Sequence, residues 1–393
     1  MKFIHCIALA ILLFGMTACS KVEYTKIDEP AYLRVFNNLN YSIGLANKDE
    51  QRPFLTMLID PVLDKDGMPI GAAVIGDFLD QRAFYAPPYP SHIGSSTSVN
   101  NPEYPGKENV LVGPVLNGFD LSSWAQVASG KHRYLFLYRP TNSIPFFNLE
   151  TSLKKKVLLD TTIQLDAGEV YTMHILQKDF TTKENGILLR QENFHKLPLS
   201  DSLLYVNFYN YSSDGFWQAD KSLKKEQPLK NMLQYGIKDE MNVWSSLFKG
   251  QTLGTAVPGY LFNYMTTIRR NTGTGEVTRY YSIPLFADPA SDGISTDIWQ
   301  RFNILAPGMH PTNMPYNDNA DDTHCNYGVI SCYSNGTQKP AREESAFMLP
   351  NMIVNVHSGT HNPRSFATIN TIEFVNGYAY LTTVQRKYPP PVY

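Results

Sequence analysis

The chain has 393 residues and balances 34 basic against 36 acidic side chains, which leaves a formal net charge of −2. A protein that binds nucleic acid through its phosphates needs an excess of lysine and arginine, so this balance argues against a nucleic-acid partner. Tyrosine (24), phenylalanine (21), proline (26) and glycine (25) are abundant, which is typical of many short strands joined by turns.

The N-terminus indicates a lipoprotein signal peptide. A basic head and a short apolar run end in the small residues Thr17 and Ala18, directly before Cys19, in a motif that resembles the bacterial lipobox. The apolar run is shorter than the roughly 20 residues that cross a membrane as a helix. We therefore expect residues 1–18 to be removed and Cys19 to be acylated. An ordinary cleaved signal with a chance cysteine is the alternative.

Acylation at one cysteine is enough to hold a protein at a membrane. Each buried CH₂ group contributes about 0.8 kcal/mol, so two or more acyl chains anchor stably. After Cys19 the sequence contains no long uncharged apolar stretch. The sequence thus predicts a tether over residues 19–29 and a cell-envelope protein at the outer membrane, with the membrane as its partner through the lipid. It leaves open which face of that membrane carries the protein.

Strand-like alternation follows the tether. Residues 32–37 (Tyr-Leu-Arg-Val-Phe-Asn) match residues 205–210 (Tyr-Val-Asn-Phe-Tyr-Asn) position by position, which indicates an internal repeat. Two further pairs of short segments are similar to each other and keep the same order along the chain: 134–138 with 260–264, and 168–172 with 377–381. Further strands are predicted over 157–165, 171–176, 277–284, 352–356 and 368–374. Helical signals are confined to 120–127 and 222–234.

These elements predict an all-β fold. We expect two tandem antiparallel β-sandwich domains, residues 30–198 and 199–393, divided within the Leu-Pro-Leu-Ser-Asp-Ser segment. Residues 85–118 and 305–344 are rich in proline, asparagine, serine and glycine, and form long loop insertions in this interpretation. Loops of that length inside a compact domain are usually functional.

Three segments carry a family resemblance. The strand 32–37, followed by 134–138 and by the Ala-Gly-x-x-Tyr-Thr pattern of 167–172, resembles a domain of unknown function that is repeated in tandem on anchored surface proteins of Bacteroidetes. The resemblance implies immunoglobulin-like sandwiches and anchoring as a lipoprotein. It covers short stretches before residue 198, and Gly377–Tyr380 departs from the pattern in the second repeat. The family implies no catalytic residues for this chain.

Two cysteines remain outside the signal and the lipidation site, namely Cys325 and Cys332. In the oxidising space outside the cytoplasm they are able to pair. A bridge that closes so short a loop gains little chain entropy, however, so a disulfide and two unpaired thiols both stay open.

Metal and cofactor motifs are weak. The densest polar cluster, residues 317–324, offers oxygen ligands of the kind that calcium takes through Asp318, Asp321 and Asp322. Counted from residue 317, the cluster lacks the glycine at the sixth position and the glutamate at the twelfth position of an EF-hand loop. An exposed acidic turn is therefore favoured. His357 and His361 lie in a strand and a turn, so they do not share a helical face. We expect no metal and no cofactor.

Catalytic motifs are missing from the sequence as well. There is no Gly-x-Ser-x-Gly elbow, and residues 271–276, with Gly273 and Gly275, indicate a polar turn rather than a nucleotide cradle. A glycoside hydrolase needs two carboxylates across a cleft, and sequence alone does not show such a pair. The carboxylates available for it include Asp214, Asp239, Glu240 and Asp297.

Aromatic residues in the loops are the main recognition candidates, because flat rings stack on sugars and on peptide partners. Most aromatic side chains of any chain are core residues instead. The candidates are Tyr85, Tyr89, Tyr104, Trp124, Phe216, Trp217, Trp244 and Trp299. We expect a non-enzymatic envelope protein that binds a glycan or a protein partner. The alternatives are a glycan-active hydrolase with an unrecognised carboxylate pair and a structural component of an envelope assembly.

Overall fold

The computed structural model describes residues 26–39, 54–82, 103–106, 108–220, 239–249, 255–294, 296, 298–305, 307–308, 310–313, 327–332, 346–348, 355–356, 364–365 and 367–386. Over these residues the chain is all-β, as predicted, and its helical segments are 3-10 turns such as η4 (Phe194–Lys196). Within the same ranges no helix has the length and apolar character needed to cross a membrane.

The strands up to residue 192, which we call the first half, form two main sheets. They are β1 (Ala31–Asn37), β2 (Leu55–Leu63), β3 (Pro69–Leu79), β4 (Glu103–Tyr104), β5 (Val115–Leu116), β6 (Phe119–Asp120), β7 (Ala125–Val127), β8 (Gly130–Tyr138), β9 (Val157–Leu165), β10 (Val170–Gln177) and β11 (Asn185–Glu192). One sheet has the order β11-β10-β1-β4, with β7 also paired to β1. The other has the order β3-β2-β8-β9.

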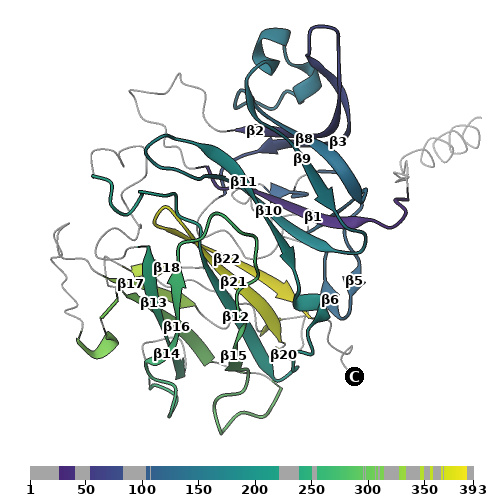
Figure 1. Cartoon of the computed structure of the whole chain (residues 1–393). Coiled ribbons are helices and arrows are strands. Elements are labelled where there is room, and N and C mark those ends of the chain that lie inside the picture. Colours follow the sequence, from purple (N-terminus) through teal and green to yellow (C-terminus); the bar gives the residue numbers. More distant parts are fainter. Residues whose placement is uncertain are drawn as a thin grey trace, which may run out of the picture.

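The strands from residue 203 onward, the second half, repeat this plan. They are β12 (Leu203–Asn210), β13 (Glu240–Lys249), β14 (Asn263–Arg269), β15 (Tyr281–Pro284), β16 (Ile298–Leu305), β17 (Tyr327–Cys332), β18 (Ala346–Met348), β19 (Asn355–Val356), β20 (Arg364–Ser365), β21 (Thr368–Val375) and β22 (Tyr378–Gln385). The two main sheets have the orders β15-β12-β21-β22 and β14-β13-β16-β17-β18. Figure 1 shows the four main sheets of the chain following one another from the top of the view to its lower left.

The internal repeat is confirmed by the pairing of the strands. β1 and β12 each take a parallel partner, β10 and β21, and each also pairs with a short antiparallel strand, β7 or β15. Residues 32–37 and 205–210 therefore occupy the same place in the two halves. The parallel partners then turn back into β11 and β22.

The two further pairs of similar segments do not occupy corresponding strands, so this part of the predicted repeat is wrong. Residues 134–138 belong to β8, whose counterpart is β16, whereas 260–264 lead into β14. Residues 168–172 enter β10, whereas 377–381 enter β22, the counterpart of β11. Short aromatic and aliphatic runs occur in most strands, so they do not identify a position in the fold. The helix expected over 120–127 is also wrong, because that segment contains the end of β6, a turn and β7.

The expectation of purely antiparallel sheets needs correction. The pairs β1–β10, β12–β21 and β17–β18 are parallel. A parallel pair needs a crossover connection. In the first half that connection runs through β2, β3, β8 and β9 of the other sheet, which lets β10 return beside β1 in the same direction.

The two main sheets of each half enclose a hydrophobic core. In the first half, Leu33 of β1 shares a cluster of buried side chains with Met57 of β2 and Phe136 of β8. In the second half, the rings of Phe208 on β12 and Phe302 on β16 meet edge to face with centroids 5.5 Å apart. Such packing between sheets follows from strands whose alternate side chains are apolar.

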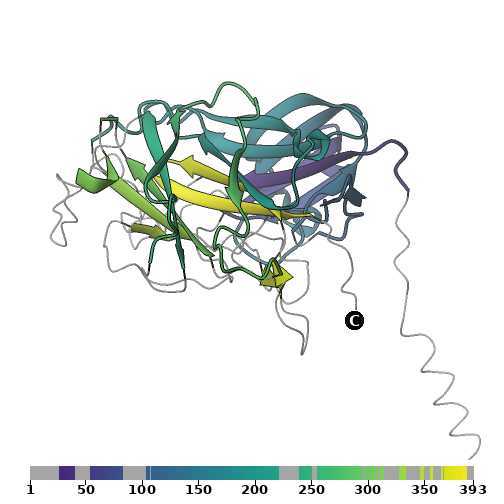
Figure 2. The same ribbon diagram turned by 90° about the horizontal axis from the view of Figure 1, so that it is seen from below.

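The halves also pack against each other. Every residue of β1 and of β21 is buried, although strand alternation alone predicts one buried face. The second face of the β1–β10 pair meets the second face of the β12–β21 pair, where Tyr32 and Phe194 join Tyr205 and Ile369 in one apolar cluster. Figure 2 shows the yellow strands β21 and β22 beside the strands of the first half.

Candidate functional site

A group of buried charges lies where the two halves meet. The interface cluster, as we call it, consists of Arg82, His174, Arg190, Glu192 and Glu373, each less than 5% exposed. Glu373 on β21 accepts hydrogen bonds from Arg82 Nη1 and from Arg190 Nη1, the latter at 2.8 Å. His174 Nε2 lies 3.3 Å from Glu373 Oε1. One carboxylate of the second half therefore meets three basic side chains of the first half.

The electrostatics of the cluster follow from burial and from these partners. Burial alone would raise the pKa of Glu373, but His174, Arg82 and Arg190 hold it well below its ordinary value. Burial likewise works to lower the pKa of Arg190, yet the carboxylate of Glu192 and the other neighbours raise it well above the ordinary value. Glu373 and Arg190 are thus ionised, and removing Glu373 leaves Arg82 and Arg190 with one anion fewer, Glu192, in a buried site.

Arg190 connects the interface cluster to two tyrosines of the second half. Its guanidinium carbon lies 4.3 Å from the ring centroid of Tyr209, and Nη1 donates to Tyr211 Oη at 2.8 Å. The two tyrosine rings stack on each other with centroids 5.1 Å apart. Both rings are almost fully buried.

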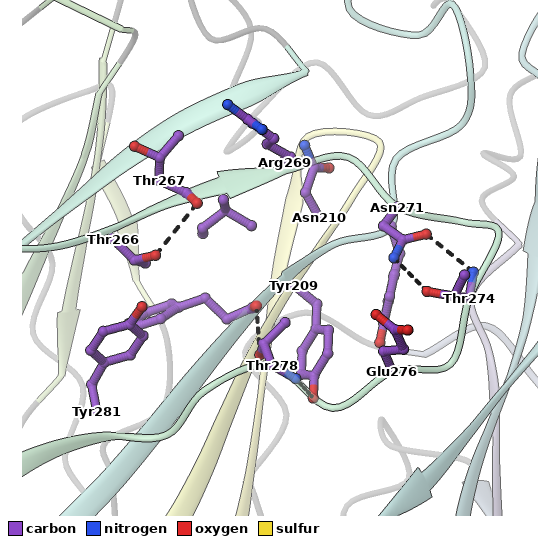
Figure 3. A pocket seen from close by; sticks show the side chains of 13 residues that line it. Tyr209, Asn210, Thr266, Thr267, Arg269, Asn271, Thr274, Glu276, Thr278 and Tyr281 are labelled. Carbon is purple, nitrogen blue, oxygen red and sulfur yellow. Dashed lines mark hydrogen bonds between the residues drawn. The ribbon is translucent and has the colours of Figure 1, made fainter.

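Tyr209 and Tyr211 also line a cavity of about 260 Å³ (Figure 3). The cavity lies between β12 and β14, and the connection from β14 to β15 forms one of its walls. Its lining residues are Phe208, Tyr209, Asn210, Tyr211, Thr266, Thr267, Ile268, Arg269, Asn271, Thr274, Glu276, Thr278 and Tyr281. The β12 residues and Ile268 are buried and form the floor, whereas Asn271, Thr274 and Glu276 are exposed. In Figure 3, Tyr281 and Glu276 lie on opposite sides of Tyr209.

The wall between β14 and β15 is a turn fastened to β12 at both ends. At its start, Asn271 N donates to the carbonyl of Asn210 at 2.9 Å, and Asn271 Oδ1 accepts from the amides of Gly273 and Thr274. This is the local bonding by which asparagine stabilises turns. At its end, Thr278 N donates to Tyr209 Oη at 3.2 Å, and Thr278 Oγ1 donates to the Phe208 carbonyl at 3.1 Å.

The lining suits an uncharged polar ligand. Four threonine hydroxyls and two asparagine amides line the cavity, and the half-buried Tyr281 adds an aromatic ring. Each of these hydroxyls and amides already makes a hydrogen bond within the protein, but a hydroxyl oxygen has two lone pairs and an amide nitrogen two hydrogens, so capacity for a ligand is left. Arg269 is already bound, since its Nε donates to Glu240 Oε1 at 2.7 Å. Among the lining residues Glu276 is the sole carboxylate.

Two carboxylates that the sequence offered for hydrolysis are engaged elsewhere. Arg270 binds both, with Nη2 at 3.0 Å from Asp214 Oδ1 and Nε at 3.0 Å from Asp239 Oδ1. Gln218 Nε2 also donates to Asp239 Oδ2. The arrangement is a charge cluster held by one arginine, and neither aspartate lines the cavity.

Several aromatic candidates from the sequence belong to the core. Tyr104 and Trp124 have no exposed surface and Phe216 is 1% exposed, so they offer no face to a ligand. Trp124 instead packs under the guanidinium of Arg34, whose carbon is 3.9 Å from the ring centroid. Trp217 is half-buried against Phe216.

Trp244 keeps part of its surface accessible. Its ring lies edge to face with Tyr264 and with His310, at centroid distances of 5.2 and 4.5 Å. These residues are on or next to the sheet that contains β14, but none of them lines the cavity.

Other predicted residues lie outside the described part of the chain. They are Cys19, Tyr85, Tyr89, Asp297, Asp318, Asp321, Asp322, Cys325, His357, His361 and the side chains of Trp299 and Cys332, together with the helix expected over 222–234. Within the described ranges, no three histidine, cysteine, aspartate or glutamate side chains are grouped so as to hold a metal ion. The predicted lipidation and the choice between a disulfide and free thiols stay predictions.

The sequence reasoning missed the residues that build the cavity. From the sequence, Tyr209 is only part of a repeated strand, and residues 271–276 are only a polar turn between strands. The signal present in the sequence is the run Asn-Thr-Gly-Thr-Gly between two strands. It predicts a tight polar turn, but it does not predict that the turn lies over Tyr209 of β12.

Comparison with known proteins adds little to this geometry. No protein-family model and no curated protein matches the chain. Among solved structures, a candidate cell adhesion protein from Bacteroides ovatus is 9% identical over 92% of this chain and 99% of its own, with a TM-score of 0.17. Another from Bacteroides uniformis is 10% identical over 92% of this chain and 100% of its own, with a TM-score of 0.14. TM-scores this low carry neither a fold assignment nor a function.

Proposed function

We propose that this chain is a lipid-anchored protein of the bacterial outer membrane that binds a sugar unit of a glycan in its cavity without cleaving it. The anchor is the acylated Cys19 expected from the sequence. The binding body is a pair of immunoglobulin-like sandwiches, residues 30–198 and 199–393. The observation that carries the proposal is the lining of the cavity.

The chemistry of that lining supports a sugar as the ligand. A sugar presents hydroxyl groups around its edge and apolar C–H faces, so it needs many neutral hydrogen-bonding groups and a flat ring. Thr266, Thr274 and Asn271 supply the first, and Tyr281 supplies the second. The volume of about 260 Å³ is just below the range of roughly 300–1,000 Å³ for pockets that take drug-sized molecules, which favours a single sugar unit over a larger group.

The same lining favours binding over hydrolysis. Glycoside hydrolysis uses two carboxyl groups that flank the bond to be cleaved, about 5 to 10 Å apart. Glu276 stands without a second carboxylate among the lining residues, and Asp214 and Asp239 are bound by Arg270. The proposal of a non-enzymatic role rests on this contrast. A glycan ligand is preferred to a protein partner because the site is a small cavity rather than a flat apolar surface.

A glycan array followed by calorimetric titration tests the proposal. The full chain with its lipid, held in detergent micelles, is expected to bind a defined set of array saccharides. Tyr281→Ala should weaken binding of these saccharides about tenfold or more, which corresponds to roughly 1.4 kcal/mol. Tyr138→Ala is the matched control, since Tyr138 is also half-buried against a core but lies in the first half. A folded protein that binds no array saccharide, or equal affinities for wild type and Tyr281→Ala, would contradict the proposal.

A further inference from the structure

We propose that the first half of the chain shapes the cavity of the second half, with Arg190 as the positioning residue and the backbone of β11 as the support of the turn 271–278. For its ligand this inference rests on the proposed function. For its geometry it rests on contacts that exist without any ligand. It implies that the two repeats form one binding unit.

The first contact runs through the floor of the cavity. Arg190 lies over the ring of Tyr209 and donates to Tyr211 Oη, and both tyrosines line the cavity. Arg190 cannot swing away easily, because Nε donates to Glu192 Oε1 at 2.9 Å while Nη1 donates to Glu373 Oε1. Tyr209 Oη in turn accepts the amide of Thr278. A chain of direct contacts therefore joins Arg190 to the end of the cavity wall.

The second contact runs through the wall itself. A Cβ atom placed on Gly275 would lie 1.8 Å from the carbonyl oxygen of Leu189 and 3.2 Å from Cα of Arg190. The turn therefore rests directly on the backbone of β11, and only glycine permits this approach. Any larger residue at position 275 must lift the turn away from the first half.

Through these two contacts, β11 supports both the floor of the cavity and the turn that forms its wall. Tyr209 lies near the end of β12, Tyr211 directly follows that strand, and the turn follows β14. β11 contacts both the two tyrosines and the turn. A change at residues 189–190, outside the cavity lining, is thus expected to alter the cavity.

Amide hydrogen exchange on the full chain tests the geometry without a ligand. The reporters are the amides of Asn271 and Thr278, which donate to Asn210 and to Tyr209. Gly275→Ala and Arg190→Lys are each expected to speed their exchange about tenfold or more, because local opening of the turn becomes easier. Arg190→Lys keeps the buried charge but loses the planar fork that spans Glu192, Glu373 and Tyr211.

Two control variants match these changes. Gly71→Ala adds a methyl group to β3, where a Cβ meets Val62 at an ordinary 3.7 Å. Arg133→Lys alters an arginine that pairs with Asp160 on the surface of the first half. Both controls should leave the exchange of Asn271 and Thr278 within about twofold of wild type. If Arg190→Lys fails to fold by near-ultraviolet circular dichroism, Gly275→Ala alone decides, since it changes no buried charge.

The outcomes separate this inference from the proposed function. Exchange that is unchanged in folded Gly275→Ala would overturn the inference, whether or not the protein binds saccharides. Faster exchange at both reporters supports it, even if array saccharides do not bind to wild type and the proposed function fails. Where wild type does bind a saccharide, Gly275→Ala should weaken that binding about tenfold, and Gly71→Ala should not change it.

Discussion

His174 of β10 and Glu373 of β21 hold the same register position in the two halves, and their side chains meet with Nε2 and Oε1 3.3 Å apart. Phe36 pairs with His174 along β1, and Tyr209 pairs with Glu373 along β12. The two repeats thus face each other through corresponding strands. The repeated position thus holds a different residue in each half, a histidine and a glutamate, and burial lowers the pKa of His174.

Glu373→Gln should destabilise the protein strongly. The variant leaves Arg82 and Arg190 buried without their shared anion, and breaking such a pair costs about 3–5 kcal/mol. Urea denaturation at neutral pH measures the loss. Glu240→Gln is the control, because Glu240 pairs with Arg269 at the surface and such pairs contribute only about 0–1 kcal/mol. Similar losses of unfolding free energy in the two variants would show that the interface cluster stabilises the protein no more than a surface ion pair does.

Glu103 should make stability depend on pH. Burial raises its pKa to about 7, although Arg34 and Arg82 act in the opposite direction. A carboxyl whose pKa is raised by folding stabilises the folded state fully below its unfolded pKa, and this stability is lost as pH rises through the folded pKa. Relative to Glu103→Gln, wild type should lose up to about 3 kcal/mol of unfolding free energy between about pH 4.5 and pH 7. Denaturation curves at several pH values measure this difference, and parallel pH profiles would contradict it.

Phe302→Ala should open a cavity in the core of the second half. Phe302 is fully buried and meets Phe208 edge to face, so the truncation is expected to cost about 3–5 kcal/mol of unfolding free energy. Urea denaturation measures it. Leu261→Ala, at a residue 48% exposed in the same half, should cost less than about 1 kcal/mol. A small loss at Phe302 would mean that the two sheets do not enclose the core described above.

Cys19→Ala should release the protein from the membrane. The acyl chains expected on this cysteine are the predicted anchor, and about 0.8 kcal/mol per buried CH₂ group is lost with them. Membrane fractionation of cells and mass spectrometry of the native protein check the expectation. If residues 1–18 are retained in the mature protein, or if Cys19 is unmodified, the proposed envelope location is contradicted. The glycan proposal, which depends on that location, then fails as well.

The local strand pattern could be predicted from the sequence. Residues 157–165 form β9 as expected, and 368–374 lie within β21. The repeat of 32–37 at 205–210 also identified the two strands with equivalent partners. These successes share one cause, because alternation of apolar and polar residues is a property of each strand by itself.

The contact between the halves could not be predicted in this way. Alternation in β1 suggests one solvated face, yet Arg34 is 3% exposed and lies over Trp124. Glu373 lies 183 residues after its partner Arg190, so their attraction appears only after folding. For the same reason, sequence reasoning placed Trp124 on a recognition surface and overlooked the turn over Tyr209. Burial of a charged or aromatic residue depends on partners that its neighbours in sequence do not reveal.

The most direct test of the claim that the two halves pack into one cooperative unit is a calorimetric scan of the full chain at neutral pH. The shared apolar cluster and the interface cluster predict one transition, with calorimetric and van't Hoff enthalpies equal. Glu373→Gln should move that transition to lower temperature. Two well-separated transitions in wild type, each with the enthalpy of one half, would contradict the account.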